Sequence, residues 1–471
     1  MSVLGEDTYF LTVSELSERI RSRRLSPVEL TEGYLDRIDR HAARLNAFVT
    51  VTRDLALAQA RDAEREIARG RYRGPLHGIP YGAKDLLATA GIKTTWGARP
   101  TRDQMFDRDA TVIRRLREAG AVLLGKLGMV EFAGCLGYRY CDSSLTGPGR
   151  NPWNTSHWTG GSSSGTGASV SAGLVAFGIG TETWGSILCP SAFCGVTGLR
   201  PTYGRVSRSG GMVGSFTLDK IGPMARSAAD CRLVLKAIAG ADPDDPSSSR
   251  EPLSLDRRSR DARRLRGALV STDFGKTKGA EPEVKAAFDG AVAELRAMGL
   301  PLEEVPLPEF PATEVAVTVL NAEAVSTFEK FYRDGTVREL RDPYARYQPE
   351  ITRELTGADY VKAMRMRAVL QERMVDFYGR YDVIVTNNFL SVAPPVDRDL
   401  NETLPYPDPV GAIGNACGLP SLALPCGFGR GHLPAGFQLM GSAFEEGLLC
   451  DLGEMYQART RFHRERPPVP A

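Results

Sequence analysis

The sequence lacks the features that mark several classes of protein. Its 59 Lys and Arg residues are nearly balanced by 57 Asp and Glu residues, so the formal net charge is only +2. That balance provides no broad basic field for binding phosphates and argues against a nucleic-acid binder. The chain contains no run of about eighteen apolar residues, and its first residues lack the basic start and apolar core of a signal peptide. We therefore expect a cytoplasmic globular protein that binds neither nucleic acid nor a membrane.

Histidine and cysteine are present, but not in the spacings that metal sites or disulfide frameworks use. The five histidines include no pair four residues apart, and no Cys-x-x-Cys motif occurs. Eight cysteines in 471 residues form no small disulfide framework, so reduced and mostly buried thiols are expected. Nothing cationic stands beside Cys189 to lower its pKa, which argues against a cysteine nucleophile. The sequence predicts neither a metal nor another cofactor.

Three side chains of reactive types stand in glycine-rich surroundings. They are Lys84 in GIPYGAKD, Ser162 in TGGSSSG and Ser186 in TETWGSI. A serine hydroxyl needs a base to remove its proton as it attacks. The run 76–83 before Lys84 carries no formal charge, and burial there would lower the lysine pKa and leave a neutral amine. Ser162 can then relay the proton between Lys84 and Ser186, so the three residues define a candidate active site.

Two rival motifs overlap the segment around Ser162. Residues 161–165 match G-x-S-x-G, the nucleophile elbow of α/β-hydrolases, with His432 or His463 available as the base. An elbow follows an apolar strand, whereas residues 154–159 are polar and turn-like. A phosphate cradle requires a following Gly-Lys-Ser/Thr, which does not occur here. Both alternatives are therefore disfavoured.

Taken together, these motifs resemble those of the amidase signature family. The resemblance rests on GPLHGIPYGAKD, NPWN, TGGSSSG and GTETWGSILCPSAFCGVTGLRPTYGRVS, and it extends to SPVEL at 26–30, GPMARSAADC after the core and NACGLP at 415–420. It covers most of the chain, and only about 255–385 is weakly matched. The resemblance implies that Ser186 is the nucleophile, that Ser162 is a bridging serine after a cis peptide bond, and that Lys84 is the base.

The resemblance also implies two sets of contacts with a substrate. The oxyanion hole would consist of the backbone N–H groups of Thr183, Trp184, Gly185 and Ser186. The acyl pocket would be bordered by Ala133, Gly134 and Cys135. Backbone donors aimed at a developing oxyanion are usually the largest single contribution to catalysis. The small side chains, and the absence of an obvious arginine clamp, favour a neutral, apolar or aromatic acyl group over a free carboxylate.

Three residues near Ser186 depart from the usual family pattern. Glu182 stands where Asp is common, Trp184 where Gly is common, and Leu188 where Arg is common. We expect the large side chain of Trp184 to alter the pocket wall or the strand behind it. Because Leu188 removes a cation that a buried acid could pair with, Glu182 must find other hydrogen bonds or raise its pKa. These departures change the expected substrate and leave the expected mechanism intact.

The sequence therefore predicts an amidohydrolase that cleaves an amide bond of a small molecule through an acyl-enzyme on Ser186. Esters and carbamates can follow the same route. One alternative stays open: the glutaminase-type A subunit of a tRNA-dependent amidotransferase, which acts only with partner subunits. The departures at 182, 184 and 188 and the near-neutral charge disfavour that alternative. The oligomeric state is also open, and a homodimer is among the options.

The expected fold class is α/β, with one amidase-signature-type domain spanning residues 1–471. It would contain a large mixed central β-sheet flanked by helices on both faces. The expected parts are N-terminal helices at 1–70, a catalytic core at 71–240, a variable β-α-β and helical substrate-mouth region at 241–385, and the rest of the sheet at 386–471.

Local patterns add expected elements within these parts. Residues 12–70 predict two helices, the first opening at Ser14 and the second over 53–69. Apolar runs predict strands at 121–125 and 174–179. Further expected elements are an internal loop at 240–249, an exposed basic loop at 257–266, a strand at 267–271, a helix at 281–298, a strand at 302–305 and a helical segment at 312–378.

Overall fold

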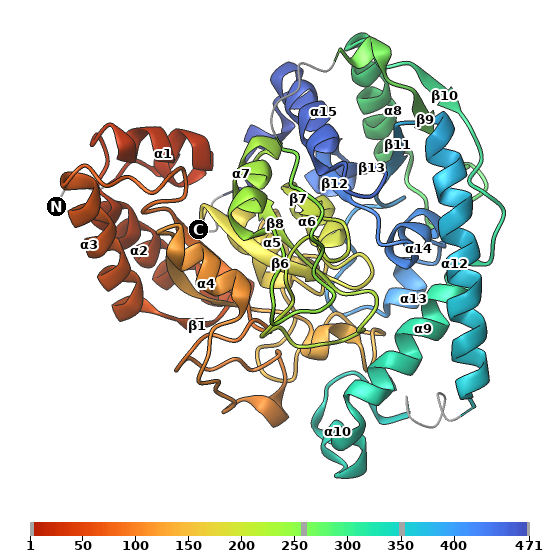
Figure 1. Ribbon diagram of the computed structural model, residues 1–471, viewed down its shortest axis with the longest axis horizontal. Coiled ribbons are helices and arrows are strands. Elements are labelled where there is room, and N and C mark those ends of the chain that lie inside the picture. Colours follow the sequence, from red (N-terminus) through yellow and green to blue (C-terminus); the bar gives the residue numbers. More distant parts are fainter. Residues whose placement is uncertain (1–3, 256–260, 348–353, 469–471) are drawn as a thin grey trace.

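A computed structural model describes residues 4–255, 261–347 and 354–468, and a large mixed sheet runs through its centre (Figure 1). Its eleven strands in the described residues lie in the order β1 (Phe48–Val51), β3 (Val122–Leu127), β2 (Pro80–Lys84), β6 (Phe177–Glu182), β8 (Lys220–Ala225), β7 (Thr197–Arg200), β12 (Ser421–Phe428), β13 (Pro434–Gly441), β11 (Val383–Asn387), β9 (Gly267–Leu269) and β10 (Leu302–Glu304). A separate hairpin joins β4 (Arg150–Asn151) to β5 (Asn154–Trp158).

The pairing of the strands explains why the sheet is mixed. Strand β2 is parallel to both of its neighbours, β3 and β6, and β9 is parallel to β10 and β11. The remaining pairs are antiparallel. Every residue of β2, β3 and β8 is buried, as expected for central strands covered on both faces. The predicted mixed sheet flanked by helices is confirmed.

The helices flank the sheet and extend beyond it at both ends (Figure 1). They are α1 (Val13–Arg21), α2 (Pro27–Leu45), α3 (Arg53–Ala68), α4 (Thr111–Glu118), α5 (Ser164–Ser171), α6 (Leu188–Cys194), α7 (Ala228–Ile238), α8 (Pro282–Ala297), α9 (Ala312–Thr327), α10 (Glu329–Arg333), α12 (Gly357–Arg380), α13 (Leu400–Thr403), α14 (Pro409–Ala416) and α15 (Glu446–Arg459). Figure 1 places α1, α2 and α3 at one end of the molecule and α9 and α12 at the other.

The prediction of two helices in residues 12–70 is wrong. The segment forms three helices, with β1 between the second and the third. The missed helix α2 has Ser26 as its N-cap, whose Oγ accepts from the N–H groups of Val28 and Glu29 at 3.0 and 3.2 Å. The first helix is capped by Thr12 and not by Ser14, because Thr12 and Glu15 form a reciprocal capping box.

The bounds of several other predicted elements lie close to the observed ones. The predicted β-α-β addition is confirmed as β9, α8 and β10, with β9 and β10 parallel. The strand predicted at 174–179 is wrong in its first three residues, because β6 starts at Phe177. The expected basic loop at 257–266 lies partly outside the described residues, and its described part includes a short 3-10 helix at Ala262–Arg264.

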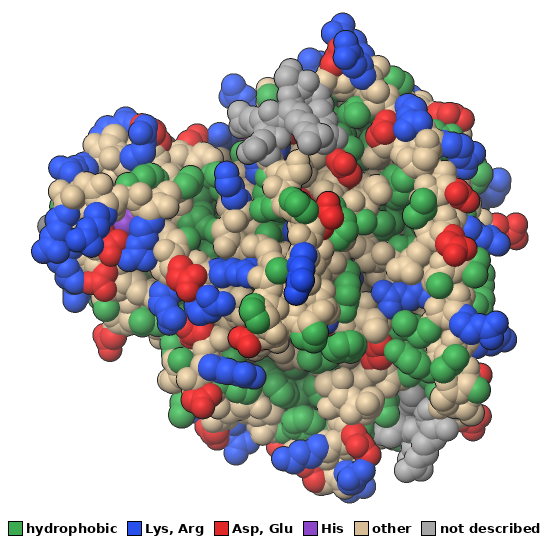
Figure 2. Space-filling model, in the orientation of Figure 1, with side chains coloured by type: hydrophobic (Ala, Val, Ile, Leu, Met, Phe, Trp, Pro, Cys, Tyr) green, Lys and Arg blue, Asp and Glu red, His purple; other side chains and the backbone are tan. Residues whose placement is uncertain are grey.

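Among the described helices, none is long and apolar enough to cross a membrane. Figure 2 shows basic and acidic side chains interspersed over the face it presents. That distribution agrees with the formal net charge of +2.

Candidate active site

The sheet topology brings the three predicted reactive residues to one edge. Lys84 is the last residue of β2, and Ser186 lies in the loop that follows the parallel neighbour β6. Ser162 lies two residues before α5, which packs against both of these strands. The carboxyl ends of parallel strands meet at the same edge of a sheet, and that edge is where ligands commonly bind. The three residues therefore gather at the edge of the sheet where β2 and β6 end.

Lys84 is buried and contacts the bridging serine directly. Its Nζ donates to Oγ of Ser162 at 2.7 Å and to Oγ1 of Thr181 at 3.0 Å. Both Lys84 and Ser162 are fully buried. Burial lowers the pKa of Lys84 to about 7, although Cys135 and the carboxylate of Asp219 oppose that shift. A substantial fraction of the amine is therefore neutral at physiological pH.

The backbone around Ser162 has the conformation that the resemblance implied. The Gly161–Ser162 peptide bond is cis. A Cβ atom on Gly161 would lie 2.6 Å from the Tyr138 hydroxyl oxygen and 2.8 Å from the Trp158 ring, so only glycine fits there without displacement. The N–H of Ser163 donates to the carbonyl of Ser186 at 3.3 Å, which ties this turn to the nucleophile loop.

Ser186 lines a cavity and is 6% exposed. Within the described residues, no hydrogen bond joins its Oγ to Ser162. The structure therefore shows the contact between Lys84 and Ser162, but not a hydrogen bond from Ser162 to the Ser186 hydroxyl. The proton relay through Ser162 to Ser186 stays a prediction. Catalytic hydrogen bonds are often long in the free enzyme and shorten when substrate binds.

The loop after β6 presents a run of free backbone donors. The N–H groups of residues 183–186, the predicted oxyanion hole, donate to no acceptor in the described structure. The next two N–H groups, of Ile187 and Leu188, both donate to Oε2 of Glu182, at 2.8 and 3.0 Å. Gly185 has φ +79°, a backbone conformation that glycine adopts without strain. Glu182 thus closes the loop and leaves the four preceding amides available.

Glu182 pairs with Arg200 in place of a cation at position 188, where this chain has leucine. Nη1 of Arg200 donates to Oε1 of Glu182 at 2.8 Å, and both side chains are fully buried. Burial raises the pKa of Glu182, but the charges of Arg200 and Lys220, together with the hydrogen bonds from Arg200 and Leu188, outweigh burial and lower the pKa overall. The expectation that Glu182 finds other hydrogen bonds is confirmed. The option of a raised pKa is wrong, because Arg200 of β7 supplies the charge that Leu188 lacks.

A cavity of about 500 Å³ opens in front of Ser186. The three residues predicted to border the acyl group, Ala133, Gly134 and Cys135, all line it. Sequence reasoning missed other lining residues, among them Tyr138, Trp158, Leu320, Phe389, Leu404 and Asp408. These come from segments up to 270 positions apart in the chain (138 to 408), so only the folded structure brings them together.

Trp184 forms part of this cavity wall, as its size led us to expect. Its indole Nε1 donates to Oδ2 of Asp408 at 3.0 Å. The other carboxylate oxygen of Asp408 accepts from the N–H of Gly411 and caps α14. Burial raises the pKa of Asp408. Among the described lining residues, Asp408 is the only Asp or Glu, and none is Lys or Arg.

The rival bases do not reach this site. The ring of His432 stacks on that of Phe428, with centroids 4.0 Å apart. His463 is buried near the C-terminal end, and burial lowers its pKa to about 4. Neither lines the cavity in front of Ser186. Cys189 does line it, but burial raises the pKa of its thiol and disfavours the thiolate.

Comparison with known proteins places this site in a family context. A family model described as Amidase matches residues 29–450. The chain is 38% identical to the A subunit of glutamyl-tRNA(Gln) amidotransferase from Moorella thermoacetica, over 98% of this chain and 99% of that protein. It is 35% identical to the corresponding protein of Carboxydothermus hydrogenoformans, over 98% and 100% of the two chains. The solved structure of native peptide amidase from Stenotrophomonas maltophilia is also similar, with a TM-score of 0.84, 32% identity and coverage of 98% and 99%.

Proposed function

Because this chain belongs to the amidase signature family, whose members cleave amide carbon–nitrogen bonds, we propose that it does so through an acyl-enzyme on Ser186. Lys84 acts as the base and Ser162 carries the proton between Lys84 and Ser186. The observation that supports these roles most directly is the 2.7 Å contact between Lys84 Nζ and Ser162 Oγ inside a fully buried environment.

The proposed reaction has two stages. Ser186 Oγ attacks the amide carbonyl carbon while its proton passes to Ser162, and the proton of Ser162 passes to the neutral amine of Lys84. The negative charge that develops on the carbonyl oxygen is stabilised by the free N–H groups of residues 183–186. The proton returns by the same route to the leaving nitrogen, and the amine departs. Water then attacks the ester of Ser186, which releases the acid and restores the serine.

The cavity favours a substrate with an apolar or aromatic acyl group. Its described lining includes Trp158, Phe389 and Leu404, and it carries no Lys or Arg that could pair with a carboxylate. The one acidic group, Asp408, already accepts hydrogen bonds from Trp184 and Gly411. Esters and carbamates of similar shape would be alternative substrates, because they present the same carbonyl to Ser186.

A second candidate function is the A subunit of a tRNA-dependent amidotransferase, which would release ammonia from an amide donor and act with partner subunits. The curated relatives favour this setting over a stand-alone amidase, since they include A subunits at 38% and 35% identity over nearly the whole chain. The similarity to peptide amidase and the cavity without Lys or Arg favour the stand-alone setting. Both settings use the same chemistry at Ser186.

One experiment separates the two settings and tests the chemistry they share. The purified chain alone would be supplied with L-glutamine, with small primary amides and with aryl amides, and release of ammonia or arylamine would be measured beside Ser186→Ala. Turnover of apolar amides without partners, absent in Ser186→Ala, supports a stand-alone amidase. Turnover of glutamine only, or only after partner subunits are added, supports the amidotransferase setting. Equal turnover by the wild type and Ser186→Ala contradicts the role of Ser186.

The burial of Lys84 sets the expected pH dependence. The ammonium form cannot accept a proton, so the enzyme is inactive below the pKa of Lys84 and active above it. We therefore expect kcat/KM for an amide to rise with pH and to level off above about 7, the pKa that burial gives Lys84. Initial rates across the neutral range, with an amide whose chemistry is slow, provide the measurement. A flat profile through that range would contradict the role of Lys84.

A further inference from the structure

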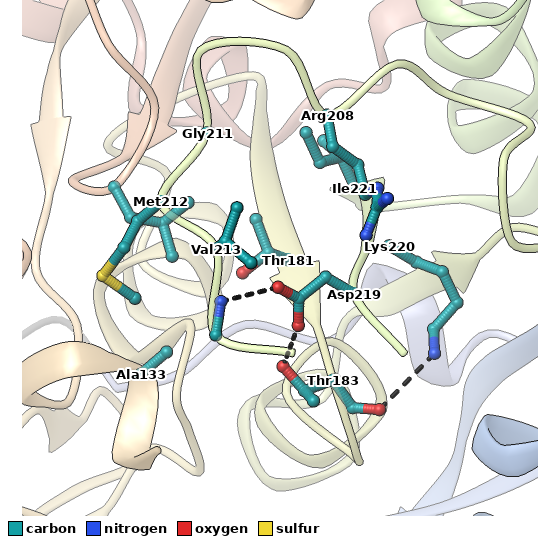
Figure 3. A pocket seen from close by; sticks show the side chains of 12 residues that line it. Ala133, Thr181, Thr183, Arg208, Gly211, Met212, Val213, Asp219, Lys220 and Ile221 are labelled. Carbon is teal, nitrogen blue, oxygen red and sulfur yellow. Dashed lines mark hydrogen bonds between the residues drawn. The ribbon is translucent and has the colours of Figure 1, made fainter. Parts of the chain in front are cut away.

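Thr183, the first residue of the predicted oxyanion hole, is held from two sides by consecutive residues (Figure 3). Its hydroxyl donates to Oδ1 of Asp219 at 2.5 Å, and its carbonyl oxygen accepts from Nζ of Lys220 at 3.4 Å. Lys220 is the first residue of β8 and pairs across the sheet with Glu182, the neighbour of Thr183. The register of β6 and β8 therefore places both contacts on Thr183.

The carboxylate that holds Thr183 is itself fixed by the loop before β8. Oδ2 of Asp219 accepts from the N–H of Gly214 at 2.7 Å and from the N–H of Ser215 at 3.0 Å. With the hydroxyl of Thr183, three donors converge on one carboxylate, which suits an acceptor with about four lone-pair sites. Asp219 has little freedom to turn away from Thr183.

The same loop is fastened to the helices of the variable region. Glu323 of α9 accepts from the hydroxyl of Ser215, and from the N–H and hydroxyl of Thr217 at 3.0 and 2.9 Å. The hydroxyl of Tyr360 on α12 donates to Glu323 at 2.8 Å. The position of Asp219 thus depends on contacts with two helices that lie outside the motifs around Ser186.

Thr183 borders two cavities. It lines the 500 Å³ cavity in front of Ser186, and it also lines a second cavity of about 20 Å³, which Asp219 and Lys220 border as well (Figure 3). The hydroxyl of Thr183 is committed to Asp219, whereas its backbone N–H donates to no described acceptor. The side chain of Thr183 therefore binds Asp219, and its backbone N–H is available to a ligand.

We propose that Asp219 and Lys220 are positioning residues that fix Thr183, so that its backbone N–H is aimed at the oxyanion formed on Ser186. The inference rests on the proposed function. It adds to that function two residues that contact neither substrate nor nucleophile and that act through the geometry of the first oxyanion donor. Preorganised donors lower the barrier because they need not reorient during the reaction, so a loosened Thr183 would affect kcat more than KM.

The test compares two substitutions of Thr183 that differ in one donor. Thr183→Val keeps the branched shape and removes the hydroxyl, whereas Thr183→Ser keeps the hydroxyl. We expect Thr183→Val to lower kcat about tenfold with KM changed less than about twofold, and Thr183→Ser to stay within about twofold of the wild type. A role limited to stability would shift the melting temperature and leave kcat of the folded enzyme unchanged.

A second pair of variants covers the case in which Thr183→Val does not fold. Asp219→Ala removes the acceptor, whereas Asp219→Asn can still accept from Gly214 and Ser215 and can donate to the Thr183 hydroxyl. We expect kcat to fall about tenfold in Asp219→Ala and to recover largely in Asp219→Asn. Asp242→Ala is the matched control for Asp219→Ala, because Asp242 is another buried carboxylate that accepts from two hydroxyls but does not line either cavity.

The outcomes separate this inference from the function on which it rests. A folded Thr183→Val enzyme with wild-type kcat, or equal losses in Thr183→Val and Thr183→Ser, would overturn the positioning role. Equal losses of kcat in Asp219→Ala and Asp219→Asn would overturn it as well. The charge of Asp219, and not its hydrogen bond with Thr183, would then determine kcat. Activity that survives in Ser186→Ala would instead defeat the proposed function itself.

Discussion

Replacing Lys84 with Met is expected to lower kcat/KM for amide hydrolysis by about 10³- to 10⁴-fold. Methionine has a similar length and fills the same buried space, but it has no atom that can accept the proton of Ser162. The substitution removes the 2.7 Å contact with Ser162 and the 3.0 Å contact with Thr181. Steady-state rates with an aryl amide, and circular dichroism to verify folding, provide the measurement.

The chain offers a matched control in Lys126 of the adjacent strand β3. Like Lys84 it is fully buried, and its Nζ donates to the carbonyl of Leu87 and to the hydroxyl of Thr94, both at 2.6 Å. Lys126→Met should reduce stability but keep kcat/KM within about tenfold of the wild type. If Lys84→Met retained more than about a tenth of wild-type activity, another group would have to act as the base.

The second large effect concerns the buried pair of Glu182 and Arg200. Glu182→Gln is expected to lower the free energy of unfolding by about 3–5 kcal/mol, because it leaves the charge of Arg200 buried without a counter-ion. Glutamine has a single carbonyl oxygen, so it can accept from Arg200 or from the N–H groups of Ile187 and Leu188, but not from both as the carboxylate does. Denaturation by urea at neutral pH provides the measurement.

An exposed ion pair provides the control for the stability change in Glu182→Gln. Asp289 pairs with Lys285 one turn away on α8, and both side chains are about half exposed. Asp289→Asn should change the free energy of unfolding by no more than about 0.5 kcal/mol. A Glu182→Gln protein within about 1 kcal/mol of the wild type would show that Arg200 finds another partner, and would remove the proposed reason why Leu188 is tolerated.

The reactive residues could be predicted from the sequence because each lies in a short local motif. Glycine-rich turns around Ser162 and Ser186, and an uncharged run before Lys84, indicate strand ends and buried loops without any tertiary information. The parallel pairing of β2 with β6 then brings those loops together. The roles of the residues were predicted from the family resemblance. The structure places Lys84 in contact with Ser162, and the relay to Ser186 stays a prediction.

Other features depend on contacts that no local pattern contains. Arg200 contacts Glu182 only because β7 and β6 both pair with β8. The contacts of Asp219 and Lys220 with Thr183 likewise depend on the pairing of Glu182 with Lys220. The cavity wall likewise combines Trp158, Leu320 and Asp408 from distant segments. These contacts appear only when the sheet has formed.

The missed helix α2 is a different case, because its signals were present. Ser26 followed by Pro27 is a common start of a helix, with an N-cap hydroxyl and a proline in the first turn. Leu30, Tyr34 and Ile38 then recur every four residues and are all buried. The two-helix interpretation overlooked this periodicity between the charged segments on either side.

The most direct test of the central claim is to identify the residue that carries the acyl group. The purified chain would be incubated with an aryl carbamate, whose acyl-enzyme is hydrolysed slowly, then quenched in acid and digested for mass spectrometry. The account predicts one carbamoyl group per chain, located on Ser186 and absent from both Ser186→Ala and Lys84→Met. Modification of Ser162 or Cys189 instead, or inactivation without any adduct on Ser186, would contradict it.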